Sequence, residues 1–143
     1  WAGRLEIIKK QSNTYFIDGA HNTHSINQLI KSLKELSSQN RYEIIFGATY
    51  GHSFNMMINK ISEISDKIYF VKSRHPKSVP TSILTNNKNL KNIEYYETGN
   101  IENAIKLTQT QNNKKVLITG SLSVVSEALE YLNNISPELY PYI

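Results

Sequence analysis

Apolar runs of strand length alternate with segments of helical period along this chain of 143 residues. The runs are rich in Ile, Val, Tyr and Phe, which suit buried, pleated strands. They predict six strands, at residues 5–9, 15–18, 42–47, 67–71, 93–96 and 116–119. Because strands and helices alternate with short links, the pattern predicts a mostly parallel sheet with helices on both faces. The loops at the carboxyl ends of the parallel strands are then expected on one rim.

Four segments between the strands repeat apolar residues every three or four positions, as amphipathic helices do. The four apolar stripes are Ile26/Leu29/Ile30/Leu33/Leu36, Met57/Ile58/Ile61/Ile64, Ile101/Ala104/Ile105/Leu107 and Val124/Val125/Ala128/Leu129/Leu132. A short side-chain oxygen can accept from an amide of the first turn, so the expected N-caps are Thr23, Ser53, Asn100 and Ser121. Residues 74–92 predict a loop with a short helix, and residues 137–143 an irregular end.

The composition narrows the class of protein. Hydrophobic residues make up 39% of the chain and charged residues 20%, which is typical of one folded domain over residues 1–143. The absence of cysteine excludes a disulfide scaffold, a thiolate metal site and a cysteine nucleophile. No apolar run is long enough to span a membrane. The chain opens with Trp1 inside what reads as a structured segment, so we expect a piece of a longer polypeptide.

The net charge of +4 does not by itself indicate a nucleic-acid partner. The densest basic group, Lys72, Arg74, His75 and Lys77, lacks the interleaved aromatic residues that are typical of nucleic-acid binders. A mild positive field would suit small anionic substrates instead. We therefore expect a monomeric, cytoplasmic protein that binds neither nucleic acid nor membrane.

The residues Asp18-Gly19-Ala20-His21-Asn22 close an apolar strand and open a helix. Open α/β sheets bind nucleotides and anions at such junctions. The run offers a carboxylate, two small residues, an imidazole and an amide at one corner. Taken alone, Asp18 is as consistent with a turn or cap as with a ribose or metal contact. His21 could bind an anion or transfer a proton, although spacing alone favours an ordinary surface histidine. His21 and His24 have no evident third ligand, so no metal site is expected.

Three further polar clusters fall at predicted loops: Trp1-Ala2-Gly3-Arg4, His75-Pro76-Lys77-Ser78 and Thr119-Gly120-Ser121-Leu122. Arg4 could bracket a phosphate or make a surface ion pair. The hydroxyl of Ser121 could hold a carboxylate or phosphate, or only cap a helix. We expect Asp18 and His21 to face Ser121 across the rim, which would form a ligand site. The chain has neither a Gly-x-x-x-x-Gly-Lys-Ser/Thr loop nor a Gly-x-Gly-x-x-Gly motif, so by itself it predicts weak ATP binding at most.

In order and spacing, these four clusters resemble the C-terminal domain of the folylpolyglutamate and dihydrofolate synthases of the Mur ligase family. The resemblance covers nearly all 143 residues. It implies an α/β, Rossmann-like fold with a mostly parallel six-stranded sheet. It also implies ATP-dependent amide ligation, in which a folate or pteroate carboxylate becomes an acyl phosphate and the amine of L-glutamate attacks it.

Carried over by position, the resemblance assigns ATP contacts to Arg4 and Asp18, with Asp18 at the ribose. It assigns His21 and Ser121 to holding the glutamate, as the catalytic residues of this chain. The phosphate loop and the Mg ligands would belong to an upstream ATPase domain, which is the expected partner together with L-glutamate and folate or pteroate. The isolated domain is then expected to be inactive.

The chain departs from the family pattern at Ala48-Thr49-Tyr50-Gly51-His52-Ser53, where the family has a turn rich in lysine and aspartate. Lys77, where arginine is common, is a smaller change. Two alternatives therefore stay open. One is another Mur-type amino-acid ligase, and the other is a non-catalytic α/β binding module, which the divergent loop favours.

Overall fold

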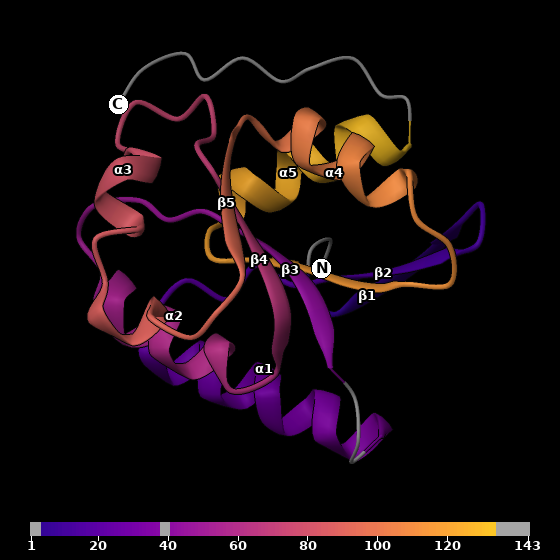
Figure 1. Ribbon diagram of the computed structural model, residues 1–143, viewed down its shortest axis with the longest axis horizontal. Coiled ribbons are helices and arrows are strands. Elements are labelled where there is room, and N and C mark those ends of the chain that lie inside the picture. Colours follow the sequence, from indigo (N-terminus) through magenta and orange to yellow (C-terminus); the bar gives the residue numbers. More distant parts are fainter. Residues whose placement is uncertain (1–3, 38–40, 134–143) are drawn as a thin grey trace.

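A central six-stranded sheet organises the computed structural model, which describes residues 4–37 and 41–133. The spatial order of the strands is β1-β2-β6-β3-β4-β5 (Figure 1). The strands are β1 (Glu6–Lys10), β2 (Asn13–Ile17), β3 (Tyr42–Phe46), β4 (Ser65–Val71), β5 (Tyr95–Gly99) and β6 (Lys115–Thr119). β1 pairs antiparallel with β2, and every other neighbouring pair is parallel. The predicted fold class, a mostly parallel six-stranded α/β sheet, is confirmed.

Each predicted strand is present, with its ends displaced by at most three residues. The largest displacement is in β5, which ends at Gly99 rather than at Tyr96 and begins at Tyr95 rather than at Ile93. The amide of Ile93 donates to the carbonyl oxygen of Leu90 at 3.0 Å, so this residue closes the preceding turn instead of joining the sheet.

Helices cover both faces of the sheet (Figure 1). They are α1 (Thr23–Leu36), α2 (Phe54–Ser62), α3 (Thr81–Leu84), α4 (Ile101–Gln109) and α5 (Leu122–Leu132), with a 3-10 turn at Lys88–Leu90. Alternate strand residues face opposite layers: Phe46 and Phe70 pack with α1 and α2, whereas Ile45 and Tyr69 pack with α4 and α5. The short helix expected within residues 74–92 is α3.

The helix starts confirm two of the four predicted caps. Asn100 and Ser121 accept hydrogen bonds from the amides of Asn103 and Val124. Ser53 stands at the N-cap of α2 but makes no capping hydrogen bond with its side chain. The prediction of Thr23 was wrong, because Asn22 caps α1 and Thr23 is the first helical residue.

Asn22 is the N-cap of α1 because it pairs with Ser25, three residues later. Its Oδ1 accepts from the amide of Ser25 at 2.7 Å, and the hydroxyl of Ser25 accepts from the amide of Asn22 at 3.1 Å. The two residues form a reciprocal capping box. The start of α1 is therefore fixed directly beside His21.

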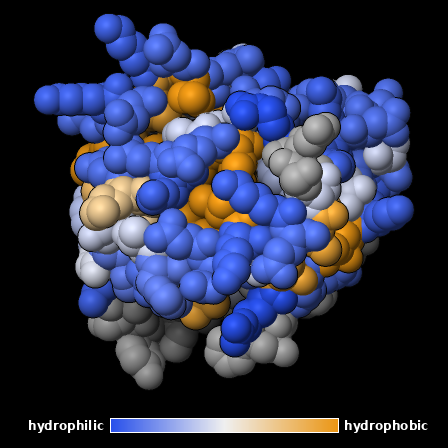
Figure 2. All heavy atoms as spheres, turned by 90° about the horizontal axis from the view of Figure 1, so that it is seen from below, coloured by the Kyte–Doolittle hydropathy of each residue, from blue (hydrophilic) through white to orange (hydrophobic). Residues whose placement is uncertain are grey.

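Two predicted stripe residues are exposed. Leu36 is 55% exposed in the last turn of α1, and Leu107 is 45% exposed on α4. The outer surface on the side of α1 and α2 is mainly hydrophilic, with hydrophobic residues in separate patches (Figure 2). Within the described ranges, no helix has the length and apolar character needed to cross a membrane.

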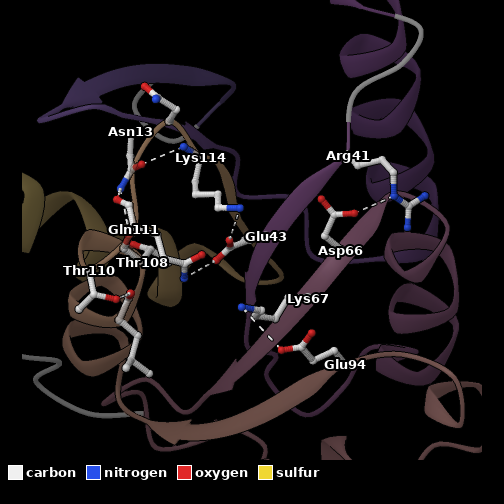
Figure 3. Close-up of polar contacts among 12 residues, drawn as sticks. Asn13, Arg41, Glu43, Asp66, Lys67, Glu94, Thr108, Thr110, Gln111 and Lys114 are labelled. Atoms are coloured by element: carbon white, nitrogen blue, oxygen red, sulfur yellow. Dashed lines mark hydrogen bonds and ion pairs between the residues drawn. The ribbon is translucent and has the colours of Figure 1, made fainter.

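Buried polar side chains hold the amino-terminal ends of the strands together (Figure 3). The amide of Asn13, 1% exposed, donates to the carbonyl oxygens of Thr108 and Gln111 and accepts from the backbone amide of Lys114. The carboxylate of Glu43, 4% exposed, accepts from the hydroxyl of Tyr69 and lies 3.8 Å from Nζ of Lys114. These contacts lie away from the carboxyl-terminal rim and stabilise the frame that carries it.

Candidate functional site

Three strand ends are joined by hydrogen bonds at the carboxyl-terminal rim. The amide of Asp18, after β2, donates to Ile118 of β6 at 3.1 Å, and the amide of Gly47, after β3, donates to Thr119 at 3.4 Å. The amide of Gly120 donates to the carbonyl oxygen of Ala20 at 3.1 Å. The turns after β2, β6 and β3 therefore form one connected surface, as the sequence predicted for parallel strands.

Asp18 is oriented by two backbone amides. Its Oδ1 accepts from the amide of Ala20 at 2.8 Å, and its Oδ2 accepts from the amide of Leu5 at 3.0 Å. Leu5 reaches this carboxylate because its backbone has a positive φ of 43° at the start of β1. Each carboxylate oxygen keeps a second lone pair, so Asp18 can still accept a hydrogen bond from a ligand.

The environment of Asp18 favours the protonated form relative to a free aspartate. Burial raises the pKa of this half-buried carboxyl group above its ordinary value. The hydrogen bonds from Ala20 and Leu5 and the positive charge of Arg4 oppose this effect without cancelling it. An additional hydroxyl or cation from a ligand would shift the balance towards the ionised form.

His21 is held in one orientation beside Asp18. Its Nδ1 lies 3.0 Å from the carbonyl oxygen of Gly19, and its backbone amide donates to the hydroxyl of Ser25 at 3.0 Å. Because a carbonyl oxygen only accepts, the proton of the neutral ring lies on Nδ1. Nε2 is then the ring atom that can accept a hydrogen bond from a ligand.

A second imidazole packs against His21. The rings of His21 and His52 meet edge to face, with centroids 5.3 Å apart and an angle of 74° between their planes. His52 comes from residues 47–53, the β3–α2 loop, which is the segment that departs from the family pattern. The divergent loop is therefore in direct contact with the candidate site.

The β3–α2 loop is also joined to residues 72–80, the β4–α3 loop. The amide of Tyr50 donates to the carbonyl oxygen of Lys77 at 2.8 Å, and the amide of Val79 donates to that of Ala48 at 2.9 Å. Thr49 and Ser78 form an isolated antiparallel bridge between these two bonds. The third predicted cluster, at residues 75–78, thus reaches the rim through its backbone.

A cavity of about 560 Å³ opens at the site. Arg4, Asp18 and His21 line it together with the first turns of α1. Leu122, the first residue of α5, lies on the opposite wall. Arg4, Asp18 and His21 are thus brought together as predicted, whereas residues 1–3 of the first cluster lie outside the described ranges.

The expectation that Asp18 and His21 face Ser121 across one cavity is not met, because Ser121 is absent from the residues that line it. The side chain of Ser121 is 2% exposed, and its hydroxyl accepts from the amide of Val124 at 3.1 Å. The capping interpretation of this serine is confirmed. Its backbone remains one residue from Gly120, which is bonded to Ala20. A ligand contact of Ser121 stays a prediction.

Another cavity, of about 920 Å³, lies elsewhere on the rim, between the ends of β4 and β5. Lys72 and Arg74 line it on one side, and Glu127 and Glu130 of α5 on the other. Arg74 binds both carboxylates, at 3.7 Å and 2.8 Å, so the charges of this wall are largely neutralised internally. In the described part of the chain, no group of three or more His, Asp or Glu side chains is placed to hold a metal ion.

A family model described as "Mur ligase, glutamate ligase domain" matches residues 3–122. The chain belongs to this family. A search of curated proteins finds no match to the sequence.

Solved structures of ligases share the fold of this Mur ligase domain. Folylpolyglutamate synthase from Thermotoga maritima has a TM-score of 0.77 and 25% identity, over 92% of this chain and 30% of that one. A bifunctional folylpolyglutamate synthase/dihydrofolate synthase with Mn, AMPPNP and L-glutamate bound has a TM-score of 0.75 and 20% identity, over 92% and 31%. E. coli FolC in complex with DHPP and ADP has a TM-score of 0.76 and 19% identity, over 94% and 32%.

This Mur ligase domain spans about a third of the length of those chains. Membership places it in a family of ATP-dependent amino-acid ligases, and two of the matching solved structures carry AMPPNP and Mn. The fold and the family that the sequence motifs indicated are thus shown.

Sequence reasoning missed two features of the site. His52 was named only as part of the divergent segment, and Ser73 and Ser123, whose hydroxyl groups bond in series to Ser121, were not singled out. Both features depend on contacts between loops far apart in the sequence. The only local signal was the departure of residues 48–53 from the family pattern, which marked this loop as different but gave no partner for it.

Proposed function

We propose that this Mur ligase domain is the C-terminal part of an ATP-dependent folate–glutamate ligase. The reaction joins the amine of L-glutamate to a folate or pteroate carboxylate that has been activated as an acyl phosphate. The observation that carries the proposal is the shared cavity of Arg4, Asp18 and His21, which the signature at residues 18–22 builds at a strand–helix junction.

The residues present fit one edge of a nucleotide. Asp18 offers oriented acceptor oxygens, which suit the hydroxyl groups of a ribose, and Arg4 supplies the positive charge that a phosphate requires. ATP, when bound, supplies the phosphoryl group that activates the acceptor carboxylate. The sequence has no phosphate loop, so the cradle for the triphosphate and the Mg ligands would come from an upstream ATPase domain.

His21 and Ser121 would hold the incoming glutamate. With its Nδ1 proton donated to Gly19, a neutral His21 keeps Nε2 as an acceptor, which can bind the ammonium group of glutamate. Holding the amine near the activated carboxylate raises its effective concentration, and closure against the upstream domain would exclude water from a labile acyl phosphate. The role of this domain is then chiefly to position the nucleophile.

The test is an assay of phosphate release by the full-length polypeptide, with ATP and Mg present. Release should require both L-glutamate and either dihydropteroate or tetrahydrofolate, and the product should contain a new amide. Release that requires a nucleotide-linked cell-wall peptide instead would assign the chain to another Mur-type ligase. No release with any acceptor would overturn the proposal in favour of a binding module.

A further inference from the structure

Four serine hydroxyls form a continuous buried chain from the β4–α3 loop to the start of α5. The oxygen atoms of Ser78 and Ser73 are 2.5 Å apart, those of Ser73 and Ser123 2.9 Å, and those of Ser123 and Ser121 3.0 Å. The four residues are 2–6% exposed. Water therefore has little access to these hydroxyl groups, and their protons are directed by one another.

Counting donors limits how this chain can be ordered. Each serine hydroxyl has one proton and two acceptor sites, and three bonds link the four oxygens. If every bond runs from Ser78 towards α5, the hydroxyl of Ser121 accepts from Ser123 and keeps its own proton. If every bond runs the other way, Ser121 donates inward to Ser123 and has no proton for a ligand.

Backbone contacts fix the far part of the chain. The amide of His75 donates to the hydroxyl of Ser73 at 3.3 Å, and the amide of Ser78 donates to the carbonyl oxygen of His75 at 3.0 Å. Ser78 is also bridged to Thr49 of the β3–α2 loop. Ser73 and Ser78 are thus held rigidly by two loops that are themselves bonded to each other.

The near end of the chain lies behind the wall of the candidate site. The hydroxyl of Ser121 accepts from Val124, which orients its second lone pair, and Gly120 is bonded to Ala20 beside His21. Val124 fills one acceptor site of Ser121, so Ser121 keeps a proton for a ligand only when Ser123 donates to its other acceptor site.

We propose that Ser73, Ser78 and Ser123 are positioning residues, which order the hydroxyl of Ser121 so that it donates to the carboxylate of the incoming amino acid. The inference rests on the proposed function, because it takes Ser121 to contact that substrate. It gives the β4–α3 loop a role in substrate binding although its serines touch no ligand. The site would therefore depend on residues that lie behind its wall.

The test measures ligation kinetics of the full-length polypeptide with Ser73→Ala and, separately, Ser78→Ala. The KM for L-glutamate should rise about tenfold in Ser73→Ala, as expected for one misdirected hydrogen bond to a charged group, while kcat and the KM for ATP stay within about twofold. Ser73→Thr and Ser78→Thr, which keep the hydroxyl, should restore a low KM. Ser62→Ala on α2, whose hydroxyl bonds only within its own helix at 2.7 Å to Ile58, is the matched control.

A double-mutant cycle separates positioning from general damage. In a Ser121→Ala background, Ser73→Ala should cause no further rise in the KM for glutamate, because the hydroxyl it orders is gone. An unchanged KM in both single variants, or a tenfold rise that persists in the Ser121→Ala background, would overturn the inference. Either result leaves glutamate-dependent activity of the unmodified enzyme intact, so failure of the proposed function would be recognised separately.

Discussion

The backbone amide of Gly120 donates to the carbonyl oxygen of Ala20 over 3.1 Å, which joins the turn after β6 to the residue before His21. This bond needs an unusual backbone, since Gly120 has a φ of +116°. A Cβ at this position would lie 2.0 Å from the carbonyl oxygen of Gly47. The closest approach of three strand ends therefore depends on a residue without a side chain.

Gly120→Ala should lower the free energy of unfolding by about 3 kcal/mol or more, because the new Cβ meets backbone atoms that cannot rotate away. Gly99→Ala is the matched control: its φ is also positive, at +77°, but nothing lies within 4 Å of the added atom. That variant should cost about 1 kcal/mol, for the backbone conformation alone. Urea unfolding of both variants measures the difference, and equal losses would show that the close contact is relieved.

Asp18→Ala and His21→Ala should each reduce kcat/KM of the full-length ligase by about a hundredfold, since each removes a group that orients a reactant. Both variants should keep the far-UV circular dichroism of the parent. Asp66→Ala tests whether loss of any aspartate has this effect, because Asp66 is exposed and pairs with Arg41 away from the rim. Near-normal turnover in the first two variants would remove the site assignment.

Asn13→Ala should destabilise the domain by about 3 kcal/mol. The substitution leaves the carbonyl oxygens of Thr108 and Gln111 and the amide of Lys114 without the buried partner that they share (Figure 3). The neighbouring Ser12→Ala should change stability by less than about 0.5 kcal/mol, because the bond of that serine to Asn112 is exposed. Guanidinium unfolding compares the two, and similar losses would contradict a special role for Asn13.

Alkaline stability should depend on Tyr69. Burial, and after it the charge and hydrogen bond of Glu43, raise the pKa of the Tyr69 hydroxyl above its ordinary value of 10.0. The folded protein then keeps this proton where the unfolded chain loses it, so the free energy of unfolding falls as the pH rises past 10. Tyr69→Phe should be less stable at neutral pH but show a flatter decline above about pH 10. Parallel curves in chemical unfolding at several pH values would contradict this assignment.

The layout of the sheet could be predicted from the sequence because most strands are short and apolar, and because every strand after β1 is followed by a segment with a helical repeat or a short helix. Local rules failed where two adjacent residues competed. Asn22 and Thr23 are both good caps, and only Ser25 at the third helical position decides between them. The exposed Leu107 shows the same limit. The helical repeat assigns it to the apolar face of α4, but it does not show whether the sheet or another helix covers that part of the face.

The candidate site was predicted as far as contiguous motifs allowed. Asp18 and His21 belong to one run of five residues, and β1 returns Arg4 to them by pairing with β2. The contacts between His21 and His52 and between Ser73 and Ser123 join residues that are 31 and 50 positions apart in the sequence. A local repeat of apolar residues cannot predict such contacts. Ser121 was correctly assigned as a cap, but its burial among other hydroxyl groups depends on how α5 packs against the β4–α3 loop.

The bridge between Thr49 and Ser78 limits how the divergent loop could have evolved. An insertion or deletion in either loop would break the register of the hydrogen bonds that Tyr50 and Val79 make with the other loop. The two loops can therefore change in composition more easily than in length. Residues 48–53 can therefore vary by substitution of side chains more readily than by insertion or deletion. In homologues that share this pairing, we expect the two segments to keep the same lengths and to differ by substitutions alone.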